Sequence, residues 1–452
     1  MYLGALVHKD DDVWDVIDIV INQLEELFLP HRVYNAKYKK EIMIQTFVGM
    51  FLGDTPQRND FCSLKRQNSD HPCAHCNIEA FHQHTDRIGE ERSVMGMLSI
   101  LKKWINGQKA VKDSLEACHS VKFIMKDKKL RSNPFWRLTK LYDFDIHKDS
   151  VVDWFHIGPI GLFKRYIDFM DTVLKKEEVE QLKKLMKSDD FKIFGRQGPP
   201  YENRKYWNGE AWLEFFAVAP FLYKAVTSHD STLTKYYKCL VRLCNWMSIL
   251  LQRSLTGTEI DRAEALCKEW RREYLALRSP ADCNFPNFHN VLHMFTHIRL
   301  WGPPVLWWTR PFEAKHRVFR RYIQQSNCRD LEKWIGEQEM IVQSARYLYP
   351  HMYYMDEVCG SRHTIKPNDD IMYRSESGEI MYARVQDISK DRTQIKVQKL
   401  TFPDKHPLLG CYKYSSAIVG DVFDLEGENY LGKLLITKDC INKYVCLQLI
   451  KK

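Results

Sequence analysis

The sequence lacks an apolar run long enough to cross a membrane, and it lacks a secretory leader. Its longest uncharged apolar run, residues 215–223, contains Pro220 and is far shorter than the ~20 residues that a membrane-spanning helix needs. The first residues, MYLGALVHKDDD, have no basic region before the apolar stretch and no small-residue cleavage site after it. These absences predict a soluble protein without a membrane partner.

The sequence also lacks a dense, even set of cysteines and a strong charge of one sign. Its 13 cysteines are an odd number scattered from Cys62 to Cys446, which favours a reducing compartment over a disulfide scaffold. The net charge is only +9 over 452 residues, so nucleic acid is permitted as a partner but required only where the charge clusters. The 44% of apolar and 13% of aromatic residues exclude a fibrous or disordered chain.

The N-terminal segment alternates strand-like and helix-like patterns. Residues 2–7 predict a short strand, and residues 13–27 have apolar side chains at helical spacing. Residues 42–52 (IMIQTFVGMFL) form a nearly continuous apolar run, which is typical of a strand buried on both faces. This order predicts part of an α/β sheet.

The rest of the chain is expected to be helical first and then rich in β-strands. Helical spacing is clear in residues 94–105, 154–174, 177–186, 235–251, 288–300 and 311–346. Short strand-like runs separated by turn signals follow at residues 371–373, 381–388, 394–400, 421–423 and 445–450, and predict a small β-barrel. The expected domains are residues 1–93, 94–280, 281–346 and 365–452.

Cys73 and Cys76 have the C-x-x-C spacing of metal ligands. The flanking residues look like a loop and open no helix, which argues against a thioredoxin-type redox motif. The two remaining ligands of a tetrahedral site come either from nearby histidines or from a distant helix. The candidates are His82 and His84, or His289 and His293, which lie one helical turn apart. His297 extends that second row, although such rows also occur in cores and interfaces.

Two acidic residues are candidates for chemistry. Asp54 follows the predicted buried strand, where ligands often bind at the edge of a sheet, but it is also a typical turn residue before Thr55-Pro56. Glu313 begins a basic helix, where a glutamate also complements the helix dipole. Asp153 and His156 form a further pair near a helix start, which a helix cap and a packed histidine would explain equally well.

Two basic clusters could contact phosphates or could simply be solvated faces. The first lies in residues 122–140 and includes Lys128, Lys129 and Arg131, with aromatic residues interleaved. The second surrounds Glu313 and includes Arg317, Arg320 and Arg321. A carboxylate inside the second cluster favours nucleic acid, because phosphate and a divalent metal would both be held there.

In this order, the segments resemble the DDE transposases encoded by CACTA-type DNA transposons. The resemblance covers about residues 1–345. It is carried by FLGDTPQ, HPCAHC, VVDWFHIGPIGLFKRY, YWNGEAWLEFFAVAP and NFHNVLHMFTHIRLWGPPVLWWTRPFEAKH. The last segment is the most specific, because it combines H-x-x-x-H, a Gly-Pro turn and Phe-Glu.

The resemblance implies an RNase H-like core interrupted by a helical insertion. It implies Asp54 and Glu313 as catalytic carboxylates that bind Mg²⁺ or Mn²⁺, and Asp153 and His156 as the D-x-x-H motif of the insertion. It also implies Cys73, Cys76, His289 and His293 as ligands of a structural zinc ion. DNA would be the partner, with a homodimer left open, the nucleus the location, and no small molecule the substrate.

The chain departs from this family at its start. The first catalytic aspartate of the family lies on an earlier strand, and no residue before Asp54 takes its place: Asp10, Asp11 and Asp12 lie in a polar connection. We therefore expect an incomplete, N-terminally truncated α/β core with little or no strand transfer. The alternative is a domesticated DNA- or chromatin-binding protein without enzymatic activity.

Overall fold

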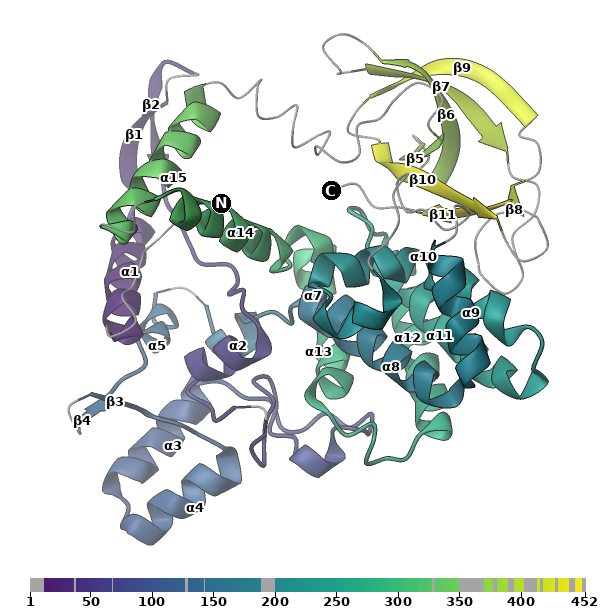
Figure 1. Cartoon of the computed structure of the whole chain (residues 1–452). Helices are drawn as coiled ribbons and strands as arrows, with labels where there is room; N and C mark the ends of the chain where they lie inside the picture. Colours follow the sequence, from purple (N-terminus) through teal and green to yellow (C-terminus); the bar gives the residue numbers. More distant parts are fainter. Residues whose placement is uncertain are drawn as a thin grey trace. The chain divides into compact units, whose positions relative to one another are not determined.

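The fold was taken from a computed structural model of the chain (Figure 1). The structure describes residues 12–35, 38–66, 68–126, 129–141, 143–187, 200–326, 330–348, 370–375, 377, 380–388, 394–401, 413–414, 418–426, 430–438 and 444–448. The strand predicted at residues 2–7 lies outside these residues, as does Lys128.

The chain forms two compact units, each made of segments that are distant in sequence. The first unit consists of Met1–Asp153, Arg278–His297 and Trp307–Ser344. The second consists of Trp154–Leu277, Ile298–Leu306 and Ala345–Lys452. The candidate metal ligands all belong to the first unit.

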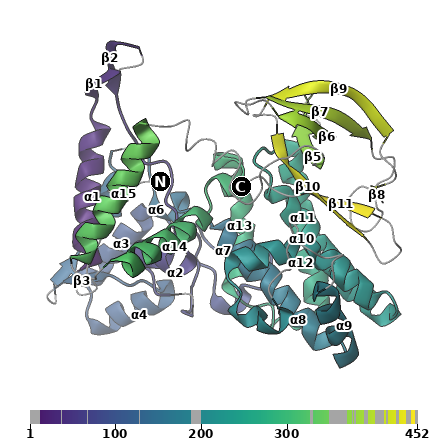
Figure 2. The ribbon, with the colours of Figure 1, turned by 45° about the horizontal axis from the view of Figure 1, so that its top comes forward.

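Helices dominate the first unit. They are α1 (Val13–Phe28), α2 (Thr55–Phe61), α3 (Val94–Asn106), α4 (Lys109–His119), α5 (Phe135–Leu138), α6 (Ile146–Asp149), most of α13 (Pro286–Trp301), α14 (Arg310–Gln325), most of α15 (Leu331–Leu348) and the 3₁₀ helix η1 (Ala80–His82). In both Figure 1 and Figure 2, α15 lies close to α1.

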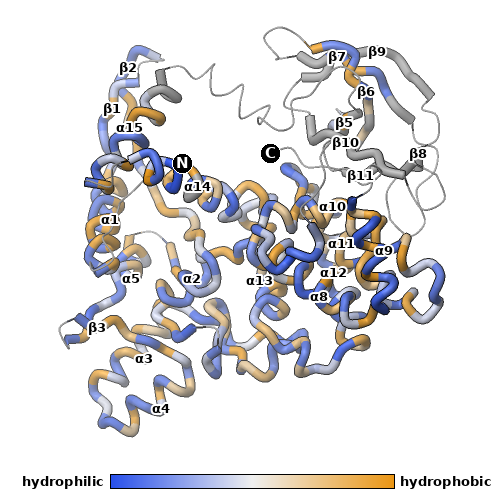
Figure 3. Tube along the Cα trace, viewed as in Figure 1, coloured by the Kyte–Doolittle hydropathy of each residue, from blue (hydrophilic) through white to orange (hydrophobic). Residues whose placement is uncertain are grey.

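The helix predicted at residues 13–27 is confirmed as α1. Asp12 caps it by accepting a hydrogen bond from the backbone N–H of Trp14 at 3.0 Å. In Figure 3 the tube of α1 alternates between hydrophobic and hydrophilic colours. Ile21 is buried on its apolar face and belongs to a core that includes Trp136 and Val94.

The helical part of the second unit is built around large aromatic side chains. Its helices are α7 (Trp154–Ile157), the π-helix η2 (Gly158–Phe163), α8 (Lys164–Val173), α9 (Lys176–Lys187), α10 (Gly209–Thr227), α11 (Thr234–Leu250) and α12 (Gly257–Leu277), with 3₁₀ helices η4 (Tyr201–Tyr206), η5 (Ser231–Leu233) and η6 (Pro304–Leu306). Trp154, Trp246 and Trp270 are fully buried there. The helical patterns predicted from residue 94 to residue 346 are thus confirmed as helices.

The strands form three antiparallel sheets in the described part of the chain. Two are hairpins: β1 (His31–Asn35) with β2 (Lys40–Ile44), and β3 (Ile124–Lys126) with β4 (Lys129–Arg131). The third has seven strands in the order β8-β11-β10-β5-β6-β7-β9. Its strands are β5 (Asp370–Arg374), β6 (Ile380–Ile388), β7 (Gln394–Thr401), β8 (Lys413–Tyr414), β9 (Ile418–Glu426), β10 (Tyr430–Lys438) and β11 (Tyr444–Gln448).

The prediction of an α/β fold with an incomplete RNase H-like core is wrong. The run at residues 42–52 is not a buried strand, because only its first residues pair, in the exposed β1–β2 hairpin. Phe47 is 75% exposed, and Phe51 makes a single parallel bridge to Ser150. Apolar composition favoured a strand, but a buried strand also needs partner strands on both sides, and the described residues provide none.

The predicted C-terminal barrel is also wrong. The five strand runs expected there do form strands, and β8 and β10 join them. However, β8 and β9 lie at opposite ends of the strand order, and no pairing between them closes the sheet in the described residues. Strand-like runs between turn signals predicted the strands, whereas closure depends on strand tilt and stagger, which a local pattern does not contain.

Candidate metal centre

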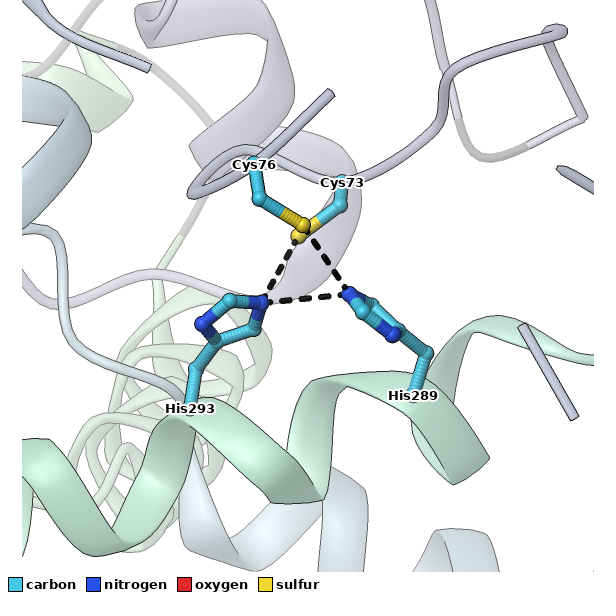
Figure 4. A group of neighbouring side chains, drawn as sticks. All are labelled: Cys73, Cys76, His289 and His293. Carbon is cyan, nitrogen blue, oxygen red and sulfur yellow. Dashed lines mark hydrogen bonds between the residues drawn. The ribbon is translucent and has the colours of Figure 1, made fainter. Parts of the chain in front are cut away.

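Four side chains of the first unit converge to form a candidate metal centre. Figure 4 shows Cys73 and Cys76 on one loop, facing His289 and His293, which lie one turn apart on α13. Cys73 Sγ lies 3.5 Å from His293 Nε2, and Cys76 Sγ lies 3.3 Å from His289 Nε2. The four ligand atoms lie within 4.8 Å of one another.

The spacing of these atoms fits a tetrahedral zinc ion. With Zn–S and Zn–N bonds of about 2.3 and 2.0 Å, the corners of the tetrahedron lie roughly 3.3 to 3.8 Å apart. The two sulfur–nitrogen distances fall in or near this range, and the two Nε2 atoms are 3.1 Å apart. Three of the four residues are buried and His293 is half-buried, so the group could hold a metal such as zinc away from solvent.

The surroundings of the two thiols shift their pKa values in opposite directions. Burial raises the pKa of the Cys73 thiol, but a hydrogen bond from Cys76 and the nearby imidazoles outweigh burial and hold this pKa well below its ordinary value. The pKa of the Cys76 thiol is raised, because Cys76 is hydrogen-bonded to Cys73 and is also buried. Thiols bind metals as thiolates, so metal binding at this pair would release protons.

The other candidate histidines lie outside this group. His82 Nδ1 pairs with Glu79 at 3.1 Å, and the His84 ring lies 3.4 Å from the side chain of Asn284. His297 is buried one turn beyond His293, and its Nδ1 accepts a hydrogen bond from the backbone N–H of Val152 at 3.2 Å. The structure thus brings together the distant pair and not the local one.

The loop between the two cysteines is held in place by His75, one of its own residues. His75 is buried, and its Nδ1–H donates to the carbonyl of His147 at 2.7 Å. In return, His147 Nδ1–H donates to the carbonyl of Ala74 at 3.0 Å. These reciprocal bonds fix the loop against the segment that contains α6.

Asp54 does not follow a buried strand. It caps α2, where its side chain accepts a hydrogen bond from the backbone N–H of Gln57 at 2.8 Å. In the same short helix, Arg58 is fully buried, and its Nη1 donates to the carbonyl of Val151 at 3.3 Å. The turn interpretation of Asp54 thus describes its geometry in this structure.

Glu313 and Asp153 are linked through the start of α14. The Asp153 carboxylate is buried and accepts hydrogen bonds from Thr309 N at 2.8 Å and from Thr309 Oγ1 at 2.6 Å. Thr309 is the N-cap residue of α14, and its carbonyl accepts the backbone N–H of Glu313 at 3.2 Å. Asp153 therefore anchors the helix that carries Glu313.

His156, the last residue of the predicted motif, and the two predicted catalytic carboxylates do not belong to the candidate metal group. His156 lies in α7 of the second unit, beside the ring of Phe155. Among the described residues, the only group of three or more possible metal ligands is the Cys₂His₂ group, which contains neither Asp54 nor Glu313.

The first basic cluster is partly neutralised by α1. Arg131 forms ion pairs with Asp12, Asp15 and Asp18. Lys126 pairs with Asp15 at 2.7 Å. Lys129 remains exposed in the β3–β4 hairpin. Part of this cluster's positive charge is therefore offset by acidic residues of α1.

The second cluster is less neutralised. Arg320 and Arg321 are exposed on α14, whereas Lys315 of the same helix is paired with the buried Glu339 of α15. The side chain of Arg317 lies outside the described residues. The exposed arginines of α14 are therefore the strongest phosphate-binding candidates among the described ones.

Sequence reasoning missed the residues that support the ligands, namely Arg92, His75 and His147. All three are buried polar side chains whose partners are mainly backbone carbonyls. Such bonds join segments that are far apart in sequence, and no local pattern marks them. The single available signal was the position of His75 inside the C-x-x-C loop.

Comparison with known proteins gives no family assignment for this chain: no family model matches its sequence, and no curated protein matches it significantly. In the part of the chain that the structure describes, no helix is long and apolar enough to span a bilayer.

Proposed function

We propose that this chain is derived from a CACTA-type DDE transposase and binds DNA in the nucleus without performing strand transfer. The observation that carries the proposal is the convergence of the Cys pair with the His pair. Cys76 and His289 are 213 positions apart, and Cys73 and His293 are 220 positions apart. The family resemblance implies these four residues as one zinc site, and the local alternative with His82 and His84 does not form.

The zinc ion would be structural. Four protein ligands complete a tetrahedral shell and leave no open position for water or substrate. When bound, the ion would tie the Cys73–Cys76 loop to α13 and would add its binding free energy to the stability of the first unit. The polar and buried surroundings of the ligands support this role.

The surroundings of Asp54 and Glu313 favour a protein without strand-transfer activity. In the transposases that the chain resembles, such carboxylates hold Mg²⁺ or Mn²⁺, and the two ions activate a nucleophile for attack on a phosphodiester. Here Asp54 caps α2, and Glu313 lies in the first turn of α14. Among the described residues, neither carboxylate belongs to a group of three or more possible metal ligands.

The DNA-binding part of the proposal rests on α14. Arg320 and Arg321 expose two positive charges on one helix, and Lys315 is held in place by Glu339. Guanidinium groups suit phosphate because they donate two hydrogen bonds in one plane.

The zinc assignment predicts that the purified chain binds about one zinc ion. Replacing both Cys73 and His293 by Ala should lower the zinc content by about tenfold or more, because half of the ligand set is lost. Elemental analysis after dialysis measures this content. The matched control is the Cys118→Ala/His84→Ala double variant, which changes the same residue types outside the group. An unchanged zinc content in the Cys73/His293 variant would show that the four-residue site is wrong.

The DNA assignment predicts salt-sensitive binding that depends on α14. The Arg320→Gln/Arg321→Gln variant should bind a DNA duplex roughly tenfold more weakly at ~0.1 M salt, and the slope of log affinity against log salt should fall by about two. Lys102→Gln/Lys103→Gln removes the same charge from exposed positions on α3 and should change the affinity less than about twofold. Fluorescence anisotropy over a salt series measures both quantities.

Two outcomes would contradict this assignment. Equal losses in the two double variants would mean that α14 is not the DNA-binding surface. Nicking of supercoiled DNA in the presence of Mn²⁺ by the wild-type chain, and its loss in a Glu313→Gln variant, would show that catalytic activity is retained.

A further inference from the structure

A single buried arginine contacts almost the whole loop that carries the two cysteines. Arg92 Nε donates to the carbonyls of Cys73 at 2.9 Å and Cys76 at 3.3 Å. Its Nη2 donates to the carbonyl of His71 at 3.2 Å and to Asn77 Oδ1 at 3.0 Å. These acceptors span the loop from before the first cysteine to just after the second.

We propose that Arg92 is the positioning residue of the metal centre, and that its guanidinium holds the Cys73–Cys76 loop in the conformation that binds the ion. The inference rests on the proposed function, because it requires that the four-residue group binds zinc. It adds a residue that neither the spacing of the cysteines nor the family resemblance assigns.

The environment of Arg92 is unusual for a charged side chain. Arg92 is only 6% exposed, and no ion pair to a carboxylate is found for it among the described residues. Burying a guanidinium is costly unless its N–H groups are hydrogen-bonded, and here the loop carbonyls supply most of these bonds. The same hydrogen bonds orient the loop and provide acceptors for Nε and Nη2 of Arg92.

A short antiparallel backbone contact between the cysteine loop and the residues before Arg92 places Arg92 beside the loop. Asn77 N donates to the carbonyl of Glu90 at 2.7 Å, and Arg92 N donates to the carbonyl of His75 at 2.8 Å. Gly89 makes this approach possible, since a Cβ atom there would lie 2.6 Å from the backbone nitrogen of Ile78. The backbone thus fixes the position of the Arg92 guanidinium independently of the four candidate ligands.

The contacts of Arg92 require a planar guanidinium with several N–H donors, and a positive charge alone would not make them. Two nitrogens of the guanidinium reach four acceptors on different sides of the loop. A lysine ammonium is a single point on a flexible chain and cannot reach all of them together. Arg58, the other buried guanidinium near the site, donates to Val151 and not to the loop.

The test measures metal affinity in the full chain. The wild-type protein is stripped of metal and titrated with Co²⁺ and Zn²⁺ against a chromophoric chelator, and the Co²⁺ d–d absorption reports the ligand set. Arg92→Gln should weaken binding by roughly 10- to 100-fold, the range typical of residues that orient metal ligands. Arg92→Lys should also weaken it, and Arg87→Gln, an exposed arginine of the same segment, should match the wild type.

At saturating Co²⁺, the Arg92→Gln protein should regain the wild-type absorption spectrum, which would show that the ligands are intact and only their positioning has been lost. Wild-type affinity in Arg92→Gln or in Arg92→Lys would overturn the inference. Failure of the wild-type chain to bind either metal would instead overturn the proposed zinc site itself.

Discussion

At the scale of single residues, buried histidines that are not among the four candidate ligands lie close to the candidate metal centre. His147 is completely buried, and its ring donates to the Ala74 carbonyl between the two cysteines. Burial lowers the pKa of His147 to about 4, because a charged imidazolium would lose its hydration. The unfolded chain has no such restriction, and its histidines titrate near pH 6.5.

This difference predicts that His147 makes the fold sensitive to acid. Below about pH 6.5, His147 is protonated in the unfolded state but stays neutral in the folded state. The free energy of unfolding therefore falls with pH until the pH reaches about 4. The loss is up to ~1.4 kcal/mol per pH unit. In His147→Asn this contribution is absent, so its unfolding free energy should fall less steeply than that of the wild type.

Denaturant unfolding at several pH values between 4 and 7 measures the two slopes. The titration of the cysteine ligands is common to both proteins and cancels in their difference. A His84→Asn variant provides a matched control that changes a half-buried histidine elsewhere in the first unit. Parallel curves for wild type and His147→Asn would count against the argument.

At the scale of elements, α14 depends on a buried bond from outside the helix. Thr309, its N-cap residue, makes no capping bond with its own side chain, and the hydroxyl instead donates to Asp153. Asp153 therefore anchors the start of α14, whereas His156, three positions later, belongs to the second unit.

The Thr309–Asp153 contact predicts a clear difference between two substitutions. Thr309→Val keeps the shape of the side chain but removes the hydroxyl donor from a buried carboxylate, so it should destabilise the protein by about 1 to 3 kcal/mol. Thr309→Ser keeps the hydroxyl and should cost less than about half as much. Chemical denaturation gives the totals, and hydrogen exchange of the first-turn amides of α14 localises the effect. Equal stabilities of the two variants would mean that the bond contributes little.

Helices and individual strands were predictable because their signal is local. Apolar residues at a spacing of three and four mark α1, α3 and α11 directly. The sheets were predicted wrongly because a strand is defined by its partners. The run that includes Phe47 has the composition of a buried strand, but its neighbours in space are not strands.

The candidate metal ligands were predictable for a different reason. C-x-x-C and H-x-x-x-H are local spacings, and each identifies half of a site. The sequence left open which histidines complete the pair, and the resemblance favoured His289 and His293, which the structure brings to the cysteines. Arg92 could not be found in this way, because its acceptors are backbone carbonyls that any residue provides.

At the scale of the whole molecule, the positive charge is distributed differently from what the sequence indicates. The lysines and arginines of residues 122–140 form one continuous basic stretch along the chain. In the folded first unit, acidic residues of α1 approach this stretch and pair with Lys126, Arg131 and Arg137. Counting charges along the sequence therefore overstates the unpaired positive charge that this surface has for binding DNA.

The candidate metal ligands are far apart in the sequence, so the cysteines are synthesised well before the histidines. Cys76 leaves the ribosome 213 residues before His289. At about 5 to 20 residues per second, the cysteine pair waits roughly 10 to 40 seconds for its histidine partners. During that interval the thiols have no complete site, and they are open to oxidation or to capture of a foreign metal. If the group binds zinc as proposed, the newly made chain needs free zinc, or a chaperone that shields the loop, during this interval.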